Sequence, residues 1–291
     1  MAALEHILPS HNKLGEGPVW GADEQVLYWV DIRNNSYARL DPISGLQNVY
    51  DVGVPIGVLA MRSRGGLVMA TKNGFAFWDP KARQLEYIKN PEQGKPYMRF
   101  NDGEVDSRGR FWAGSMSEAN NPQPEGVLYR LDPDLSIHVM ETGLGISNGL
   151  GWSPDDRIMY LTDSARGTIY AYDFDAETGS ITNRRVFVDA TKESYDPDGL
   201  TVDSQGYVWS ACWNGAKVLR YSPEGKLDRT IDVPALRPTS CVFGGPDLTD
   251  LYITSSRDAL TQDQLENYPF SGDLFRLRTD VKGMQQHKFL G

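Results

Sequence analysis

Hydrophobic and polar residues alternate with a period of two along most of the chain, without a sustained helical period of 3.6. Such alternation is typical of β-strands with one buried face, and it excludes a helical solenoid. The pattern repeats in six similar units, each with a glycine-led apolar strand, a polar turn, an aromatic strand and a third strand. These units cover residues 14–45, 57–82, 101–134, 147–175, 197–225 and 239–280. Only the segment from Thr261 to Tyr268 favours a short helix.

Repeats of about 40 to 50 residues with several strands each are typical of radial β arrays. Six such repeats predict an all-β, six-bladed β-propeller that forms a single domain over residues 1–291. In that architecture the first strand of each blade lines a central channel. Residues at the starts of these strands therefore share one mouth of the channel.

Four of the six units begin with a polar residue followed by glycine, at Glu16, Asp102, Asn148 and Asp198. Single pairs of this kind are common in turns. Four pairs in the same register argue against ordinary turns, and glycine suits a channel where neighbouring backbones approach closely. The second and sixth units have no charge at this place and predict pocket wall instead, at Ile56-Gly57 and Ser240-Cys241.

Carboxylate and amide oxygens that converge on a channel are hard ligands, suited to Ca²⁺, Mg²⁺, Mn²⁺ or Fe²⁺. Two anionic ligands and one neutral amide nearly cancel a divalent charge and leave positions open for water and substrate. This balance predicts a catalytic metal in the central channel rather than a sealed structural site. The register places Asp102 with the ligands and its neighbour Asn101 one residue out of phase.

The composition argues against nucleic acid and membranes as binding partners. The formal net charge is -10, from 39 acidic against 29 basic residues, which argues against binding to nucleic acid. No stretch approaches the roughly 20 apolar residues that span a bilayer, so no membrane partner is expected. The first residues lack a signal-peptide pattern, and we expect an unprocessed, soluble, cytoplasmic protein in which Cys212 and Cys241 are free thiols. No pattern indicates a particular oligomeric state.

Four sequence runs resemble motifs of the SMP-30/gluconolactonase/LRE-like family, in the family's order: LGEGPVW, RFNDGEVDSRGRFWAGSM, SNGLGWSPD and DPDGLTVDSQGYVW. The resemblance covers essentially the whole chain, which is most similar to the bacterial aldono- and pentonolactonases. It implies a six-bladed propeller with one divalent cation, Ca²⁺, Fe²⁺, Mn²⁺, Mg²⁺ or Zn²⁺, held by Glu16, Asn148 and Asp198. It also implies that Arg99 and Asn101 face the substrate and that Asp198 serves as general base.

The resemblance and the register disagree about one pair of neighbours. The register favours Asp102 as a ligand, whereas the resemblance favours Asn101 as a substrate contact. A third carboxylate would overcharge the site for one divalent ion, so we assign Asp102 to capping the turn. The family also has a substrate-contacting glutamate in a lid segment. That segment reads EANNPQPEG here, and neither Glu118 nor Glu125 is assigned to the role.

These features predict metal-dependent hydrolysis of a sugar lactone, such as a pentono-1,4-lactone or gluconolactone, with water attack assisted by Asp198. The alternatives are a phosphotriesterase-type hydrolase and a non-enzymatic calcium-binding propeller. A serine hydrolase is suggested only by the G-x-S-x-G match at 145–149, which needs a following helix where a strand is expected. His6, His11, His138 and His287 lie outside the motifs and are expected at the surface. Trp20 and Trp213 are candidates for a sugar-stacking surface.

Overall fold

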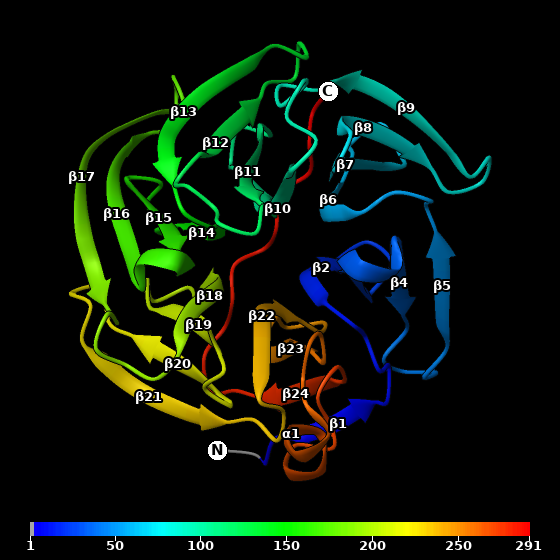
Figure 1. The fold of residues 1–291 in the computed structure, drawn as a ribbon, viewed down its shortest axis with the longest axis vertical. Coiled ribbons are helices and arrows are strands. Elements are labelled where there is room, and N and C mark those ends of the chain that lie inside the picture. Colours follow the sequence, from blue (N-terminus) through cyan, green and yellow to red (C-terminus); the bar gives the residue numbers. More distant parts are fainter. Residues whose placement is uncertain (1–2) are drawn as a thin grey trace.

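The computed structural model describes residues 3–291 as six four-stranded antiparallel sheets set radially around a central channel (Figure 1). Each sheet is one blade, and the blades are numbered 1 to 6 in chain order from the blade that begins at Gly15. The predicted all-β, six-bladed propeller is therefore confirmed.

Every blade runs outward from the channel through four strands. The innermost strands are β2 (Gly15–Gly21), β6 (Ile56–Met61), β10 (Met98–Val105), β14 (Ser147–Trp152), β18 (Asp196–Val202) and β22 (Arg237–Gly244). The second strands are β3 (Val26–Asp31), β7 (Leu67–Thr71), β11 (Phe111–Ser117), β15 (Ile158–Asp163), β19 (Val208–Trp213) and β23 (Asp250–Ser256). The third strands are β4 (Ser36–Leu40), β8 (Gly74–Asp79), β12 (Gly126–Leu131), β16 (Thr168–Asp175), β20 (Lys217–Tyr221) and β24 (Leu274–Arg278).

The outermost strands are the part of each blade that the alternation pattern does not predict. They are β5 (Gln47–Asp51), β9 (Gln84–Lys89), β13 (Ile137–Leu144), β17 (Ser180–Asp189), β21 (Leu227–Asp232) and β1 (Glu5–Leu8). Most of their side chains are exposed, and none of the residues of β9 is buried. A strand with little buried surface carries no alternation of apolar and polar residues.

Blade 6 takes its outer strand from the other end of the chain. β1 pairs antiparallel with β24, with Glu5 opposite Arg276 and His6 opposite Phe275. The Glu5 carboxylate also accepts a hydrogen bond from Arg276 Nη2 at 2.6 Å. This pairing closes the ring and covers the edge of β24 that would otherwise be open to another chain.

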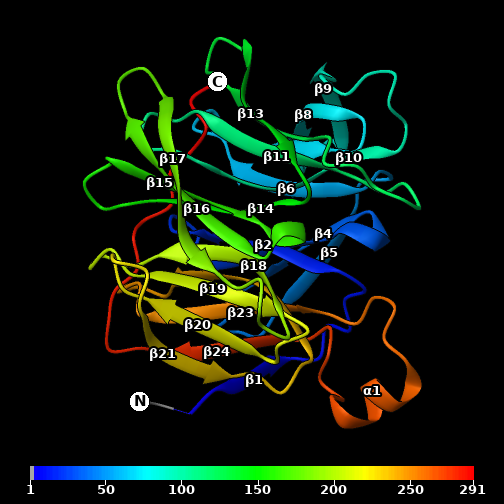
Figure 2. The ribbon, with the colours of Figure 1, turned by 60° about the vertical axis from the view of Figure 1, so that its left-hand side comes forward.

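The short helix α1 (Gln262–Asn267) lies in the connection between β23 and β24, where the sequence predicts it. Thr261 caps its N-terminus, because its hydroxyl accepts a hydrogen bond from Gln264 N while the Gln264 side chain accepts one from Thr261 N. Figure 2 shows α1 projecting from one face of the disc, which we call the upper face. Two single 3₁₀ turns, η1 (Ile32–Asn34) and η2 (Ser164–Arg166), follow β3 and β15 at the same face.

All six innermost strands carry one extra residue relative to their partner strand, at the place where the polar-glycine pairs recur. The interruptions lie between Glu16 and Val19, Ile56 and Val58, Phe100 and Gly103, Ser147 and Leu150, Pro197 and Leu200, and Pro238 and Ser240. A bulge breaks the strict alternation of side chains, so two successive residues can both reach the channel. The recurring polar-glycine pairs in the sequence therefore mark the bulge that each innermost strand carries.

At the bulges of β6 and β14 a glycine allows the neighbouring innermost strand to approach closely. A Cβ on Gly149 would lie 2.5 Å from Leu200 N, and one on Gly57 would lie 2.6 Å from the Phe100 carbonyl carbon. Real Cβ atoms do not occupy such positions. Any side chain here would force blades 2 and 3, or 4 and 5, apart at the channel.

The C-terminal segment crosses the opposite, lower face of the ring from blade 6 to blade 3 (Figure 1). Gly283 N donates to Leu248 O at 2.8 Å, Phe289 N donates to Met61 O at 2.9 Å, and Leu290 N donates to Gly109 O at 3.1 Å. No helix within residues 3–291 is long and apolar enough to cross a membrane.

Candidate metal centre and substrate cavity

A cavity of about 280 Å³ opens at the upper mouth of the channel. It is lined by all five residues that the sequence singles out: Glu16, Arg99, Asn101, Asn148 and Asp198. They come from four innermost strands, β2, β10, β14 and β18, which lie far apart in the sequence and meet only because the ring closes.

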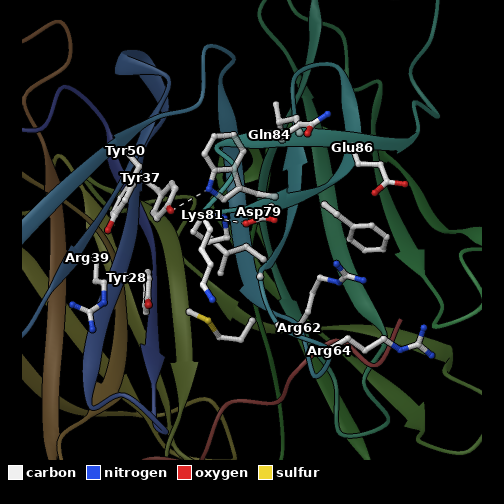
Figure 3. A pocket seen from close by; sticks show the side chains of 18 of the residues that line it. Tyr28, Tyr37, Arg39, Tyr50, Arg62, Arg64, Asp79, Lys81, Gln84 and Glu86 are labelled. Atoms are coloured by element: carbon white, nitrogen blue, oxygen red, sulfur yellow. Dashed lines mark hydrogen bonds between the residues drawn. The ribbon is translucent and has the colours of Figure 1, made fainter.

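A larger cavity, of about 850 Å³, lies between blades 1 and 2 (Figure 3). Its walls include Tyr28, Tyr37 and Tyr50 on one side and Lys81 on the other (Figure 3). Arg39, at its edge, is paired with Glu24 at 3.0 Å. None of the five residues lines it, so size alone does not identify the functional site.

Asn148 is the central residue of the candidate metal centre. Its Nδ2 donates to Asp198 Oδ1 and, at 3.0 Å, to Ser164 Oγ. Its Oδ1 is buried and has no hydrogen-bond partner among the described residues. A buried amide oxygen without a donor is costly, and a bound cation would satisfy it.

Glu16 and Asp198 bring two carboxylates into the same buried region. Burial raises the pKa of both groups well above the usual range, and the charge of Asp102 raises both further. The charge of Asp198 also raises the pKa of Glu16. Mutually repelling buried carboxylates favour a cation between them.

These donors fit a divalent metal ion. Within residues 3–291 no three His, Cys, Asp or Glu side chains form a metal-binding group, so the donor set would be two carboxylates and one amide. The all-oxygen set agrees with the hard cations expected from the sequence.

Arg99 and Asn101 orient each other on the wall beside this centre. Arg99 Nη1 donates to Asn101 Oδ1 at 2.7 Å and to its neighbour's carbonyl, Phe100 O, at 3.0 Å. Asn101 Nδ2 donates to Ser147 O at 3.0 Å, which ties β10 to β14. Both side chains are buried and fixed before any ligand arrives.

Glu118, to which the sequence assigns no role, links four blades at the upper mouth. Its carboxylate accepts hydrogen bonds from Arg99 Nε at 3.1 Å, Arg33 Nη1 at 2.8 Å and Lys72 Nζ at 3.1 Å. Arg33 also pairs with Asp258 at 2.9 Å. These partners come from blades 1, 2, 3 and 6, so no local sequence pattern could reveal the network. Neither Glu118 nor Glu125, the other candidate in the segment, is among the residues that line the cavity, and Glu125 is exposed.

Two further acids hold the loops that lead into the candidate metal centre. Asp31 accepts from Lys13 N at 2.9 Å and from Leu14 N at 3.1 Å, just before Glu16. Asp163 does the same for Gly145 N at 3.0 Å and Ile146 N at 3.1 Å, just before Asn148. The sequence carries a signal for both, because each acid ends the second strand of its unit in the similar runs VDIRN and TDSAR.

Asp102 lies deeper in the channel than its neighbour Asn101. It lines a separate cavity of about 30 Å³, together with Glu104 and with Gln286 from the C-terminal segment. Its Oδ1 accepts from Gly103 N at 2.7 Å within the bulge of β10, and Glu16 accepts from Gly17 N in the same way, so this bond does not distinguish a capping role from that of a ligand. Burial raises the pKa of Asp102 to about 6 and that of Glu104 to about 8.

The structure also decides where the remaining serine, histidine, cysteine and tryptophan candidates from the sequence lie. Ser147 of the G-x-S-x-G match is fully buried and begins strand β14, so the nucleophile-elbow alternative lacks its helix. All four histidines are exposed, and both cysteines are buried free thiols, as predicted.

Of the two tryptophans predicted as possible sugar-stacking surfaces, Trp213 lines the cavity. Trp20 is wrong as a sugar-stacking candidate, because it is buried near the lower face and stacks on Tyr252 at 5.5 Å.

Comparison with known proteins gives consistent results. The SMP-30/Gluconolactonase/LRE-like region family model matches residues 14–257. Regucalcin from Xenopus laevis is 37% identical over 294 residues, which cover 99% of this chain and 98% of the relative. Among solved structures, the calcium-binding protein regucalcin from Agrobacterium tumefaciens matches with a TM-score of 0.94 at 27% identity, covering 99% of this chain and 97% of that one. A luciferin-regenerating enzyme matches with a TM-score of 0.91 at 30% identity, covering 97% of each chain.

Proposed function

The chain belongs to the SMP-30/gluconolactonase/LRE-like family, and on this premise we propose that it hydrolyses a sugar lactone to the open-chain acid with the help of one divalent cation. The observation that carries the proposal is the unpartnered, buried Oδ1 of Asn148 beside the carboxylates of Glu16 and Asp198 in the cavity of the upper mouth. A structural polar cluster would have satisfied that oxygen internally.

Glu16, Asn148 and Asp198 would hold the cation. A divalent ion at this place supplies Lewis-acid polarisation of the lactone carbonyl and stabilises negative charge on its oxygen. The chain's own contribution to the attack is a base. Asp198 is fixed by Asn148 Nδ2, and its carboxylate would take the proton from the attacking water.

Arg99 and Asn101 would bind and orient the lactone. Arg99 uses Nε and Nη1 within the protein, whereas its Nη2 has no partner among residues 3–291 and is available to the ligand. A guanidinium beside the cavity suits both a sugar hydroxyl and the carboxylate that ring opening produces. The volume of about 280 Å³ fits one sugar ring rather than an oligosaccharide.

The test is a lactone panel run against a metal panel. Protein stripped with a chelator is reloaded separately with Ca²⁺, Mn²⁺, Mg²⁺, Zn²⁺ or Fe²⁺, and acid release from five- and six-membered aldonolactones is followed with a pH indicator. We expect activity that returns with at least one ion. Absence of acid release with every lactone and ion would overturn the proposal, as would full activity of the stripped protein.

A second candidate is that cation binding is itself the function, which is favoured by the description of the Agrobacterium relative as calcium-binding. Calorimetry with Ca²⁺ on the same stripped protein separates the two. Tight Ca²⁺ binding without turnover of any lactone, or of an organophosphate triester included in the panel, would favour the second candidate.

A further inference from the structure

Trp213 differs from the other six tryptophans of the chain in its surroundings. The other six are buried, and three of them, Trp29, Trp112 and Trp209, are completely enclosed. Trp213 is half-buried and lines the cavity that contains Glu16, Asn148 and Asp198. A large aromatic side chain left partly open in a concave polar site calls for an explanation other than core packing.

The orientation of the Trp213 indole is fixed from outside the cavity. The Arg237 guanidinium lies over the ring, with its central carbon 4.6 Å from the ring centroid. Arg237 is itself held by Asn214 Oδ1 at 2.7 Å and by the carbonyl oxygen of Asp258. Trp213 also packs against the apolar cluster that contains Leu14. The indole is therefore a rigid wall rather than a mobile cover.

Trp213 lies on the strand next to the one that carries the proposed base, Asp198. It ends β19 directly opposite Asp196, two residues before Asp198 on β18. On the blade 3 and 4 side of the ring, Met116 and Ile146 form a bridge between β11 and the start of β14 and line the same cavity. The cavity is thus lined by several apolar side chains as well as by polar and charged groups.

We propose that Trp213 is the stacking surface for the ring of the substrate and thereby a specificity-determining residue. This inference rests on the proposed lactonase function and deepens it. One face of the lactone ring, bearing C–H groups, packs on the indole, while the carbonyl is directed to the Glu16, Asn148 and Asp198 group and the hydroxyls to Arg99 and Asn101. The substrate class is a single-ring sugar lactone with one face free of bulky substituents.

Three variants separate stacking from simple space filling. Trp213→Phe keeps an aromatic face, Trp213→Leu keeps apolar bulk against Leu14, and Trp213→Ala removes both. Tyr87→Ala is the matched control, because Tyr87 is 48% exposed on the outer strand of blade 2. Circular dichroism and thermal unfolding check that each variant is folded.

The readouts are KM and kcat on the lactone that the wild type turns over best, and calorimetric affinity for the corresponding lactam, which is not hydrolysed. Loss of a stacking contact of roughly 1.4 kcal/mol corresponds to about a tenfold change. We expect Trp213→Ala and Trp213→Leu to raise KM and the lactam Kd about tenfold with kcat changed less than about threefold. Trp213→Phe should stay within about threefold of wild type, and the Kd for Mn²⁺ should not change in any variant.

The inference is overturned if Trp213→Leu matches the wild type in KM and lactam affinity, because the residue would then only fill space. It is also overturned if kcat falls while lactam affinity is retained. Failure of the proposed function looks different, since the wild type itself would then release no acid from any lactone.

Discussion

At the scale of single residues, Asn148 combines two tasks that neither a carboxylate nor an aliphatic side chain could perform together. Its Nδ2 donates to Asp198 and Ser164, and its Oδ1 remains for a cation. An aspartate at this position would lose both donated hydrogen bonds and add a third negative charge beside Glu16 and Asp198. The choice of an amide therefore keeps the charge balance of the centre.

The roles of the two carboxylates can be separated by substitution. Asp198→Asn keeps the shape of the side chain but removes the proton acceptor, and we expect kcat to fall by at least about 10²-fold. Glu16→Ala removes a proposed ligand, and we expect the Kd for the proposed divalent ion to rise by more than about tenfold. Titration calorimetry and initial rates measure these effects. Asp134→Asn, an exposed surface change, is the control. Wild-type metal affinity in Glu16→Ala would contradict the assignment.

We expect Glu104 to make the stability of the protein depend on pH. Burial raises its pKa from 4.5 in the absence of structure to about 8, so the folded protein holds a proton that the unfolded chain releases. Stability therefore falls as the pH rises between about 5 and 8, with a slope of at most about 1.4 kcal/mol per pH unit from this group. Glu104→Gln retains an acceptor for Gln286 and should remove this part of the slope.

The measurement is denaturant unfolding of wild type and Glu104→Gln at half-unit steps from pH 5 to pH 9. The difference in unfolding free energy should grow in favour of the variant with rising pH. Glu125→Gln, at an exposed position, should show no such trend. A difference that is constant across the range would contradict the raised pKa.

At the scale of elements, the bulged hairpin is the repeated unit of this fold. The same irregularity places Glu16, Asn148 and Asp198 in three strands and uncharged residues at Ile56 and Ser240 in two others. The pocket wall predicted at Ile56 and Ser240 is not found, because neither residue lines the cavity of the upper mouth. The backbone geometry of the bulge repeats in all six blades, whereas the side chains at the bulge differ from blade to blade. The candidate site is therefore asymmetric although the backbone around it is nearly symmetric.

The close approach of neighbouring innermost strands can be tested with Gly149→Ala. The new Cβ would lie 2.5 Å from Leu200 N and 2.7 Å from Asp198 O, both backbone atoms. We expect a loss of stability of about 2 kcal/mol or more, and weaker metal binding because the strands that carry Asn148 and Asp198 must separate.

Gly45→Ala provides the comparison for this variant. Gly45 has a φ of +72° and no heavy atom within 4 Å of the new Cβ, so only the backbone cost of about 1 kcal/mol applies. Metal affinity should be unchanged in that variant. If Gly149→Ala behaved like Gly45→Ala in both measurements, the close contact would not matter.

The second hairpin feature is a buried aspartate in the turn of blades 3 and 5. In blade 5, Asp203 accepts from Trp209 Nε1 at 2.9 Å and from Arg220 Nη2 at 2.7 Å, and from two turn amides. Asp203→Ala should cost about 3–5 kcal/mol, because Arg220 would remain buried without its main partner. Asp228→Ala removes a partly exposed partner of the same arginine and should cost at most about 1 kcal/mol. Equilibrium unfolding in urea compares the two.

At the scale of the whole molecule, the ring could be predicted from the sequence because its six hairpins bury one face each and repeat their turn chemistry. The outer strands could not, since exposed strands carry no alternation. The pairing of β1 with β24 joins opposite ends of the chain and leaves no local trace. Glu16, Asn148 and Asp198 stood out because ring closure converts equal register into proximity, whereas Arg99 and Asn101 were expected only from the family resemblance.

The parts of the site that the sequence did not reveal depend on contacts between blades or on strand direction. Glu118 receives Arg33, Lys72 and Arg99 from separate blades. Trp20 and Trp213 lie on strands that run in opposite directions. Trp20 is near the end of β2, an innermost strand that runs from the upper mouth to the lower face, whereas Trp213 ends β19, a second strand that runs back to the upper mouth. The direction of each strand in its hairpin could therefore have distinguished the two tryptophans from the sequence alone.

The C-terminal segment has a kinetic consequence. Gln286 lies across the lower end of the channel, where its Oε1 accepts a hydrogen bond from Trp20 N at 2.7 Å and its Nε2 donates to Glu104. Only a cavity of about 30 Å³ remains at this end. If the proposed function holds, the lactone would enter and the acid would leave through the upper mouth alone, so the acid would have to leave before the next lactone binds. We expect the product to inhibit competitively, raising the apparent KM and leaving the maximal rate unchanged. Initial rates at several fixed product concentrations would show this, and a maximal rate that falls as product concentration rises would contradict it, because product and substrate could then be bound together.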